Sequence, residues 1–83
     1  MKTINRLSLK ALLLDTITYL KFGHHLAPNY KITKNLLCNM SGVKTTINAK
    51  QLLSLIGTIY QDNNLGNEYI ETLTNLKATK FIN

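Results

Sequence analysis

Apolar residues recur along this chain at the three- and four-residue spacing of amphipathic helices. Breaks rich in glycine, proline and asparagine divide this pattern into four segments. The spacing predicts helices over about residues 5–22, over about residues 29–41, from Thr46 or Asn48 to about Tyr60, and from Asn67 onward. Four short helices in 83 residues predict an all-α fold with one small domain over residues 1–83, packed as a bundle or an orthogonal array.

Each predicted helix has a side on which large apolar residues gather, and we expect these sides to form the core. In chain order, the expected core positions are Leu9, Leu12, Leu13, Ile17 and Leu20; Ile32, Leu36, Leu37, Met40 and Val43; Leu52, Leu53, Ile56, Ile59 and Tyr60; and Tyr69, Ile70, Leu73 and Leu76. Three further leucines lie outside a single apolar stripe on each helix and are left over from the core: Leu7, Leu14 and Leu55. Thr16, Ile17 and Thr18 are β-branched, so the alternative is a helical domain with one short strand near Tyr19.

The residues at the segment boundaries are types that begin or end helices. Gly23 and Gly42 stand where the first two helices should end, because glycine accepts the backbone angles found there. Asn48 followed by Gln51 approximates a capping box for the third helix, and Asn67 is the expected N-cap of the fourth. Acids at the start of the fourth helix and lysines at its end would complement the helix dipole. These residues are Glu68, Glu71, Lys77 and Lys80.

Charge is distributed unevenly along the chain. Lys and Arg number 10 against 4 Asp and Glu, which gives a formal net charge of +6. Residues 16–61 contain no acid at all, although they include five lysines. A surface without acids attracts a negatively charged partner. The sequence therefore predicts a basic binding protein whose partner is nucleic acid or an acidic protein surface.

Location follows from the cysteine content and from the apolar runs. Cys38 is the single cysteine, so it cannot form an internal disulfide, and this favours a reducing compartment. Asp15 interrupts the apolar run that follows the basic N-terminus, so we expect no export signal. No window is apolar over the ~18 residues that a membrane span needs. We expect a cytoplasmic protein with no transmembrane segment.

Catalytic and metal-binding chemistry has few candidates in this sequence. Cys38 with His24 or His25 is the one nucleophile and base pair that the composition permits. Cys38, flanked by Leu37 and Met40, is better explained as a small core residue. The two histidines have no Cys, Asp or Glu at a ligand spacing from them. We therefore expect no enzymatic activity, no metal site and no cofactor.

Residues 34–56 show the order helix, glycine turn, helix that is typical of a helix-turn-helix DNA reader. Cys38, Gly42 and Val43 fit the small, turn and apolar positions of that motif, while Asn48 stands where a buried residue belongs. Basic and polar residues around the turn are types that contact phosphates and base edges. The predicted binding residues are Tyr30, Lys31, Lys34, Lys44, Thr45, Thr46, Asn48, Lys50 and Gln51.

Three hypotheses of function follow. The first is a small nucleic-acid-binding regulator that uses its helix-turn-helix-like segment. The second is a protein-directed inhibitor or immunity factor, because the spacing of apolar positions from Gly42 to Tyr60 resembles that of bacteriocin immunity proteins. That resemblance implies a basic four-helix bundle and an acidic protein or membrane-associated complex as partner. The third is a homodimer or other oligomeric subunit, suggested by the leftover leucines and the small size of the chain.

Overall fold

All four expected α-helices are present in a computed structural model, which describes residues 5–82. The helices are α1 (Arg6–Phe22), α2 (Tyr30–Ser41), α3 (Ala49–Asp62) and α4 (Gly66–Asn75), with short 3-10 helices η1 (His24–Leu26) and η2 (Thr79–Phe81). The predicted all-α class is confirmed, and residues 5–82 contain no strand. Tyr19 lies inside α1, so the alternative of a strand at that position is wrong.

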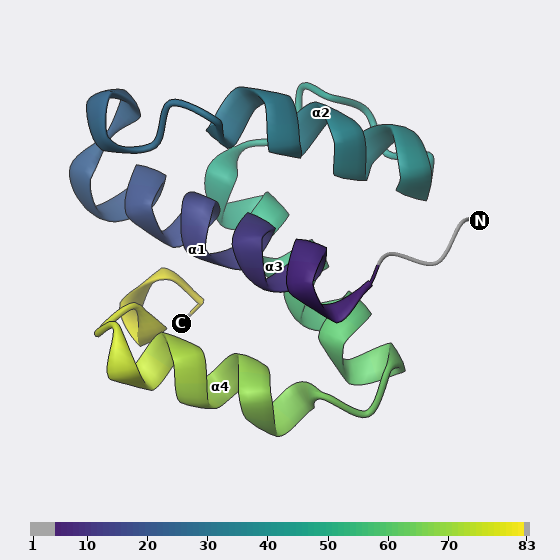
Figure 1. The fold of residues 1–83 in the computed structure, drawn as a ribbon, viewed down its shortest axis with the longest axis vertical. Coiled ribbons are helices and arrows are strands. Elements are labelled where there is room, and N and C mark those ends of the chain that lie inside the picture. Colours follow the sequence, from purple (N-terminus) through teal and green to yellow (C-terminus); the bar gives the residue numbers. More distant parts are fainter. Residues whose placement is uncertain (1–4, 83) are drawn as a thin grey trace.

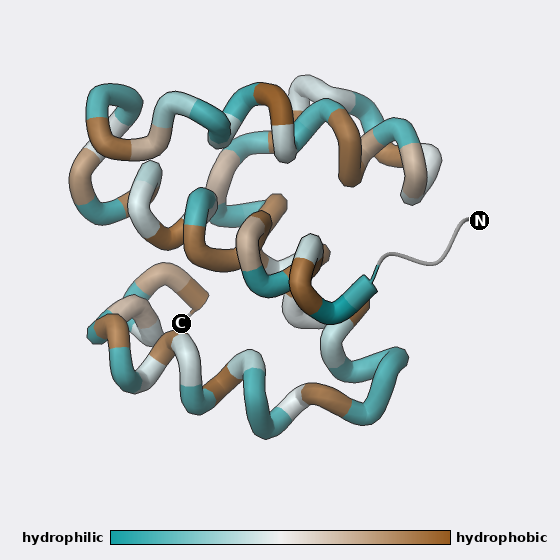
Figure 2. The backbone as a smooth tube through the Cα atoms, in the orientation of Figure 1, coloured by the Kyte–Doolittle hydropathy of each residue, from teal (hydrophilic) through white to brown (hydrophobic). Residues whose placement is uncertain are grey.

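Helix α1 lies between α2 and α4, with α3 crossing behind it (Figure 1). Helix α3 packs against both α1 and α4, and α2 packs against α1. The buried side chains of the four helices form one continuous cluster. Leu13 of α1, Leu52 and Ile56 of α3 and Leu73 of α4 are 0% exposed. Hydrophobic and hydrophilic residues alternate around every helix in Figure 2, because each helix buries one side and leaves the other to solvent.

Local capping sets most of the helix boundaries. The backbone N–H of Ser8 donates to Asn5 Oδ1 at 2.8 Å, which caps α1, and Gly23 ends that helix with a φ of 88°. The predicted capping box is confirmed at α3. Gln51 N–H donates to Asn48 Oδ1 at 2.8 Å, and Asn48 N–H donates to Gln51 Oε1 at 3.2 Å. These contacts involve neighbours in the sequence, so the residue types alone predict them.

The ends of α4 differ from the prediction. The N-cap is Leu65, and Asn67 lies in the first turn, so the expected cap at Asn67 is wrong. The helix ends at Asn75 and has no basic residue in its last turn, so the predicted role of Lys77 and Lys80 there is also wrong. Instead Lys21, at the end of α1, donates from Nζ to the Leu76 carbonyl oxygen at 2.7 Å. A cation from another helix thus compensates this negative helix end.

The predicted inward side of α2 is rotated. Ile32 is 63% exposed and Leu36 is 57% exposed, so placing them in the core was wrong. The buried side of α2 carries Tyr30, Leu37 and Cys38. The same error occurs in α4, where Ile70 and Leu76 are exposed. For α2 the reason is that this helix packs mainly against α1 alone, so only one narrow side of α2 is covered.

Two buried tyrosines differ in whether their hydroxyl group forms a hydrogen bond. Tyr69 Oη donates to the Leu53 carbonyl oxygen at 2.9 Å, whereas Tyr60 Oη has no partner among the described residues. We expect Tyr60→Phe to raise the free energy of unfolding by about 1 kcal/mol, because it removes an unsatisfied buried hydroxyl. We expect Tyr69→Phe to lower it by about 1 kcal/mol, because the Leu53 carbonyl loses its donor. Urea denaturation of both variants measures the difference in sign, and equal destabilisation would contradict it.

Candidate partner-binding surface

The lysines of the predicted site come from three consecutive elements. Lys31 and Lys34 lie on α2, Lys44 lies in the connection over residues 42–48, and Lys50 lies in the first turn of α3. Lys31, Lys44 and Lys50 are exposed. Lys34 is half-buried, and its Nζ lies 5.8 Å from the centre of the Tyr30 ring. In Figure 1 the connection passes back behind α2, so α3 begins beneath that helix and not beyond its end.

The four acids of the chain lie outside residues 30–51. Glu68 and Glu71 are on α4, Asp62 ends α3 and Asp15 is on α1. Among residues 5–82 there is one ion pair, between the Arg6 guanidinium and the Glu68 carboxylate. Within that range, then, no lysine of residues 30–51 is paired with an acid. The helix dipoles add to this charge, because neither α2 nor α3 has an acid in its first turn.

The connection between α2 and α3 is longer than a helix-turn-helix motif uses. Residues 42–48 separate the two helices, whereas the motif joins them by a turn of about 3–4 residues. Lys44, Thr45 and Thr46 are exposed in this connection and do not lie on the first turn of α3. Gly42 ends α2 in the left-handed conformation, with a φ of 71°. Lys44, Thr45 and Thr46 are therefore presented by a loop and not by the start of a recognition helix.

Three predicted site residues have structural roles. The side chains of Asn48 and Gln51 are both engaged in the capping box of α3. Tyr30 is the first residue of α2 and is only 7% exposed, so it is not free to contact a partner. Its ring stacks on Tyr19, with the ring centres 4.0 Å apart and the planes at 14°. Stacking of Tyr30 on a nucleic-acid base would require separating this pair.

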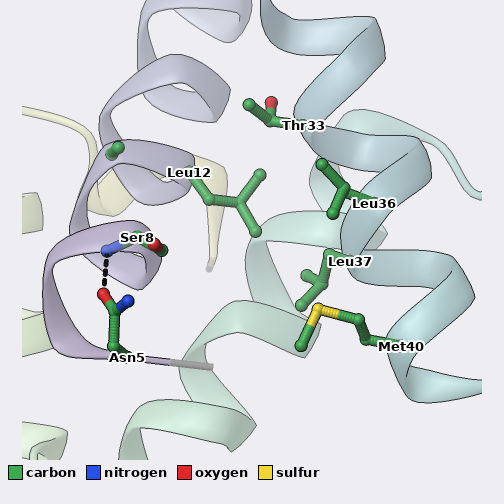
Figure 3. A pocket seen from close by; sticks show the side chains of 8 residues that line it. Asn5, Ser8, Leu12, Thr33, Leu36, Leu37 and Met40 are labelled. Atoms are coloured by element: carbon green, nitrogen blue, oxygen red, sulfur yellow. Dashed lines mark hydrogen bonds between the residues drawn. The ribbon is translucent and has the colours of Figure 1, made fainter. Parts of the chain in front are cut away.

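A second surface feature, absent from the sequence-based expectations, is an apolar groove between α1 and α2. It has a volume of about 360 Å³. Its lining residues are the N-cap Asn5; Ser8, Ala11 and Leu12 from α1; and Thr33, Leu36, Leu37 and Met40 from α2. Figure 3 shows Leu12 pointing across the groove toward Leu36 and Leu37. Periodicity alone assigned Leu36 and Met40 to the core, which concealed the groove. The leftover leucines do not line this groove, so no signal in the sequence pointed to it.

The cysteine and the two histidines that were considered for catalysis or metal binding differ in their exposure to solvent. Cys38 is 0% exposed, which confirms it as a small core residue. His24 and His25 are exposed on η1, with their ring centres 6.2 Å apart. Across residues 5–82, no three side chains of His, Cys, Asp or Glu lie together as metal ligands would. Burial raises the pKa of Tyr69 to about 12, so this hydroxyl stays a neutral donor to Leu53.

Comparisons with known proteins place the chain in no family. No protein-family model, no curated protein and no solved structure matches it. The resemblance of residues 42–60 to bacteriocin immunity proteins therefore stays a prediction. Among the described helices, none combines the length and the apolar character that crossing a bilayer demands.

Proposed function

We propose that this chain is a small non-enzymatic binding protein that contacts nucleic acid through the lysines of residues 30–51 and acts as a regulator. The observation that carries the proposal is the charge of this segment. It holds four lysines and no acid, and no described acid pairs with those lysines. Lysines that have no acid partner are available to neutralise phosphates, and the counterions released on binding favour the complex.

The geometry supports phosphate contacts more than reading of base sequence. Lys44, Thr45 and Thr46 lie on an exposed loop, where ammonium and hydroxyl groups can donate to phosphate oxygens. Base readout in the major groove needs a helix that presents side chains from its first turn. In α3 that turn uses Asn48 and Gln51 for its own capping. We therefore propose binding with little sequence preference. A buried, free Cys38 suits the cytoplasm as the compartment.

The test is a salt series of fluorescence-anisotropy titrations on labelled duplex DNA and single-stranded RNA. For duplex DNA we expect the logarithm of the binding constant to fall with the logarithm of salt concentration, with a slope of about −2 to −4 for two to four phosphate contacts. Replacing both Lys44 and Lys50 by Glu should abolish binding at ~150 mM salt, because two attractions become repulsions. Circular dichroism should show unchanged helicity, because both side chains are exposed.

The matched control replaces Lys77 and Lys80 by Glu. These two lysines are exposed as well and lie beyond α4, so the change in net charge is identical. The control should keep most of the affinity. If both double variants lose affinity equally, the binding depends on net charge and not on residues 30–51. Affinity that does not change with salt would also contradict the phosphate contacts.

A second candidate is an acidic protein partner, as for an inhibitor or immunity factor. The observation that favours it is the pairing of charge and apolar surface on α2. Ile32 and Leu36 are exposed on the same helix as Lys31 and Lys34. Affinity purification from the native host distinguishes the candidates. Recovery of one stoichiometric acidic protein without nucleic acid, lost in the Lys44 and Lys50 double variant, would favour this candidate.

A further inference from the structure

One side of α1 carries an apolar stripe of four residues, none of which is buried. Its residues are Leu7, Ala11, Leu14 and Thr18, of which Leu7 is 84% and Leu14 is 37% exposed. The spacing of four, three and four residues is that of a coiled-coil seam. The opposite side of α1 is fully used by the core, through Leu9 and Leu13 among others. The helix therefore has one apolar side for its own fold and a second one for a partner.

We infer that two copies of this chain pair through α1, with the two α1 helices side by side and running in the same direction. The inference does not depend on the proposed function, because none of the lysines of residues 30–51 lies in the stripe. A two-fold pairing is self-complementary, so each stripe covers the other. Ala11, near the middle of the seam, has a small side chain that allows the helices to approach closely.

Charge favours a second copy in this orientation. Lys10 and Asp15 flank the stripe on its two opposite sides, five residues apart, at the g and e positions of the heptad. In a parallel pair each Lys10 faces Asp15 of the other copy, so the contact forms twice. Lys10 Nζ is held beside the stripe by donation to Thr72 Oγ1 at 3.0 Å, and Asp15 has no ion pair among residues 5–82.

Burying the stripe would cost little in lost solvation of charged and polar groups. Its four residues carry no charge, and the next position of the same spacing, Lys21, turns its ammonium to the Leu76 carbonyl oxygen at 2.7 Å, so like charges stay out of the centre of the contact. Thr18 Oγ1 donates to the Leu14 carbonyl oxygen at 2.8 Å, so its hydroxyl proton is already satisfied within the helix. Covering the seam would therefore leave no hydroxyl donor of Thr18 unpaired.

The available area indicates a weak dimer. A stable interface buries about 800 Å² on each partner, which is roughly one seventh of the 5464 Å² surface of this molecule. The outer side of α1 is about 25 Å long and about 10 Å wide, so it falls short of that area by itself. Leu36 of α2 is exposed and lines the same groove as Ala11, so it supplies apolar surface next to the stripe. We expect a dissociation constant of about 10–100 µM, as for interfaces below the standard size.

Sedimentation velocity from about 5 µM to about 1 mM chain tests the pairing on the full-length protein. We expect a reversible monomer–dimer equilibrium that changes little with salt, because salt screens both the repulsion of the net charges and the two Lys10–Asp15 contacts. Nucleic-acid binding weakens steeply with salt, so the two proposals fail independently. Leu14→Glu should weaken the dimer at least about 30-fold, because a charge enters the seam twice. Ile70→Glu, an equivalent change at a 49% exposed site on α4, should leave it unchanged.

Charge reversal and cross-linking test the direction of the pair. Lys10→Asp or Asp15→Lys should each weaken the dimer about three- to tenfold, and the double reversal should restore it, because the two residues meet only between copies. Leu7→Cys should form a symmetric disulfide on mild oxidation. A cross-link that requires Leu7→Cys together with Thr18→Cys would show antiparallel helices and overturn the parallel pairing. A strict monomer at 1 mM would overturn the dimer itself.

Discussion

Replacing Leu37 by alanine is expected to lower the free energy of unfolding by about 2–4 kcal/mol, whereas Leu36→Ala should change it by less than about 0.5 kcal/mol. The two leucines are neighbours on α2, but Leu37 is 2% exposed and Leu36 is 57% exposed. Loss of the Leu37 side chain leaves a cavity against α1, while loss of the Leu36 side chain removes part of a groove wall that faces solvent.

Urea denaturation followed by circular dichroism measures both values, and each variant serves as the control for the other. The substitutions are chemically identical and lie in the middle of the same helix, so differences in helix propensity cancel. The periodicity of the sequence alone places both leucines in the core and predicts similar losses. Equal destabilisation would therefore mean that α2 is rotated relative to the structure described above.

Gly57→Ala is expected to lower the free energy of unfolding by about 1–3 kcal/mol, although alanine normally favours a helix. A Cβ atom at Gly57 would lie 2.7 Å from Cζ of the Tyr69 ring. That ring is 6% exposed, and its hydroxyl donates to the Leu53 carbonyl oxygen at 2.9 Å. The ring can move away only by giving up this hydrogen bond or by separating α3 from α4, so the overlap is costly.

Gly66→Ala is the matched control, because a Cβ there meets nothing within 4 Å. Gly66 is the first residue of α4, so alanine should leave stability unchanged or raise it by up to about 1 kcal/mol. Thermal and urea denaturation of both variants measure the contrast. A Gly57→Ala protein as stable as the Gly66→Ala protein would contradict the close packing of α4 on α3. Gly57→Ala combined with Tyr69→Phe should cost less than the sum of the two single losses, because a ring without the hydrogen bond to Leu53 can shift.

The two proposals concern different parts of the surface. The lysines that we assign to nucleic acid are on α2, the following connection and the start of α3, while the pairing stripe is on α1. A dimer through α1 would leave those lysines free and double their number. Two linked basic surfaces bind a polyanion more tightly than one, because the second contact is intramolecular. A weak dimer could in this way support regulation that depends on protein concentration.

Local chemistry explains why much of the fold could be predicted. The four helices follow from the spacing of apolar residues, the C-terminal ends of α1 and α2 follow from Gly23 and Gly42, and the start of α3 follows from the Asn48–Gln51 box. These contacts join residues at most five apart in the chain, so they need no information about the rest of the protein. The acid-free segment over residues 16–61 could also be found from the sequence alone, because the positions of charged residues are read directly from it.

By itself, then, the sequence determined the all-α class, the helix boundaries set by capping and the uneven distribution of charge. The tertiary structure decided which side of α2 is buried, that Lys21 of α1 compensates the end of α4, and that Tyr30 stacks on Tyr19. The packing of the helices also left the stripe on α1 in contact with solvent and formed the groove between α1 and α2. These features depend on which helix lies next to which. A periodic pattern shows that a helix has an apolar side, but when apolar residues surround much of the helix, its neighbours choose the side that is covered.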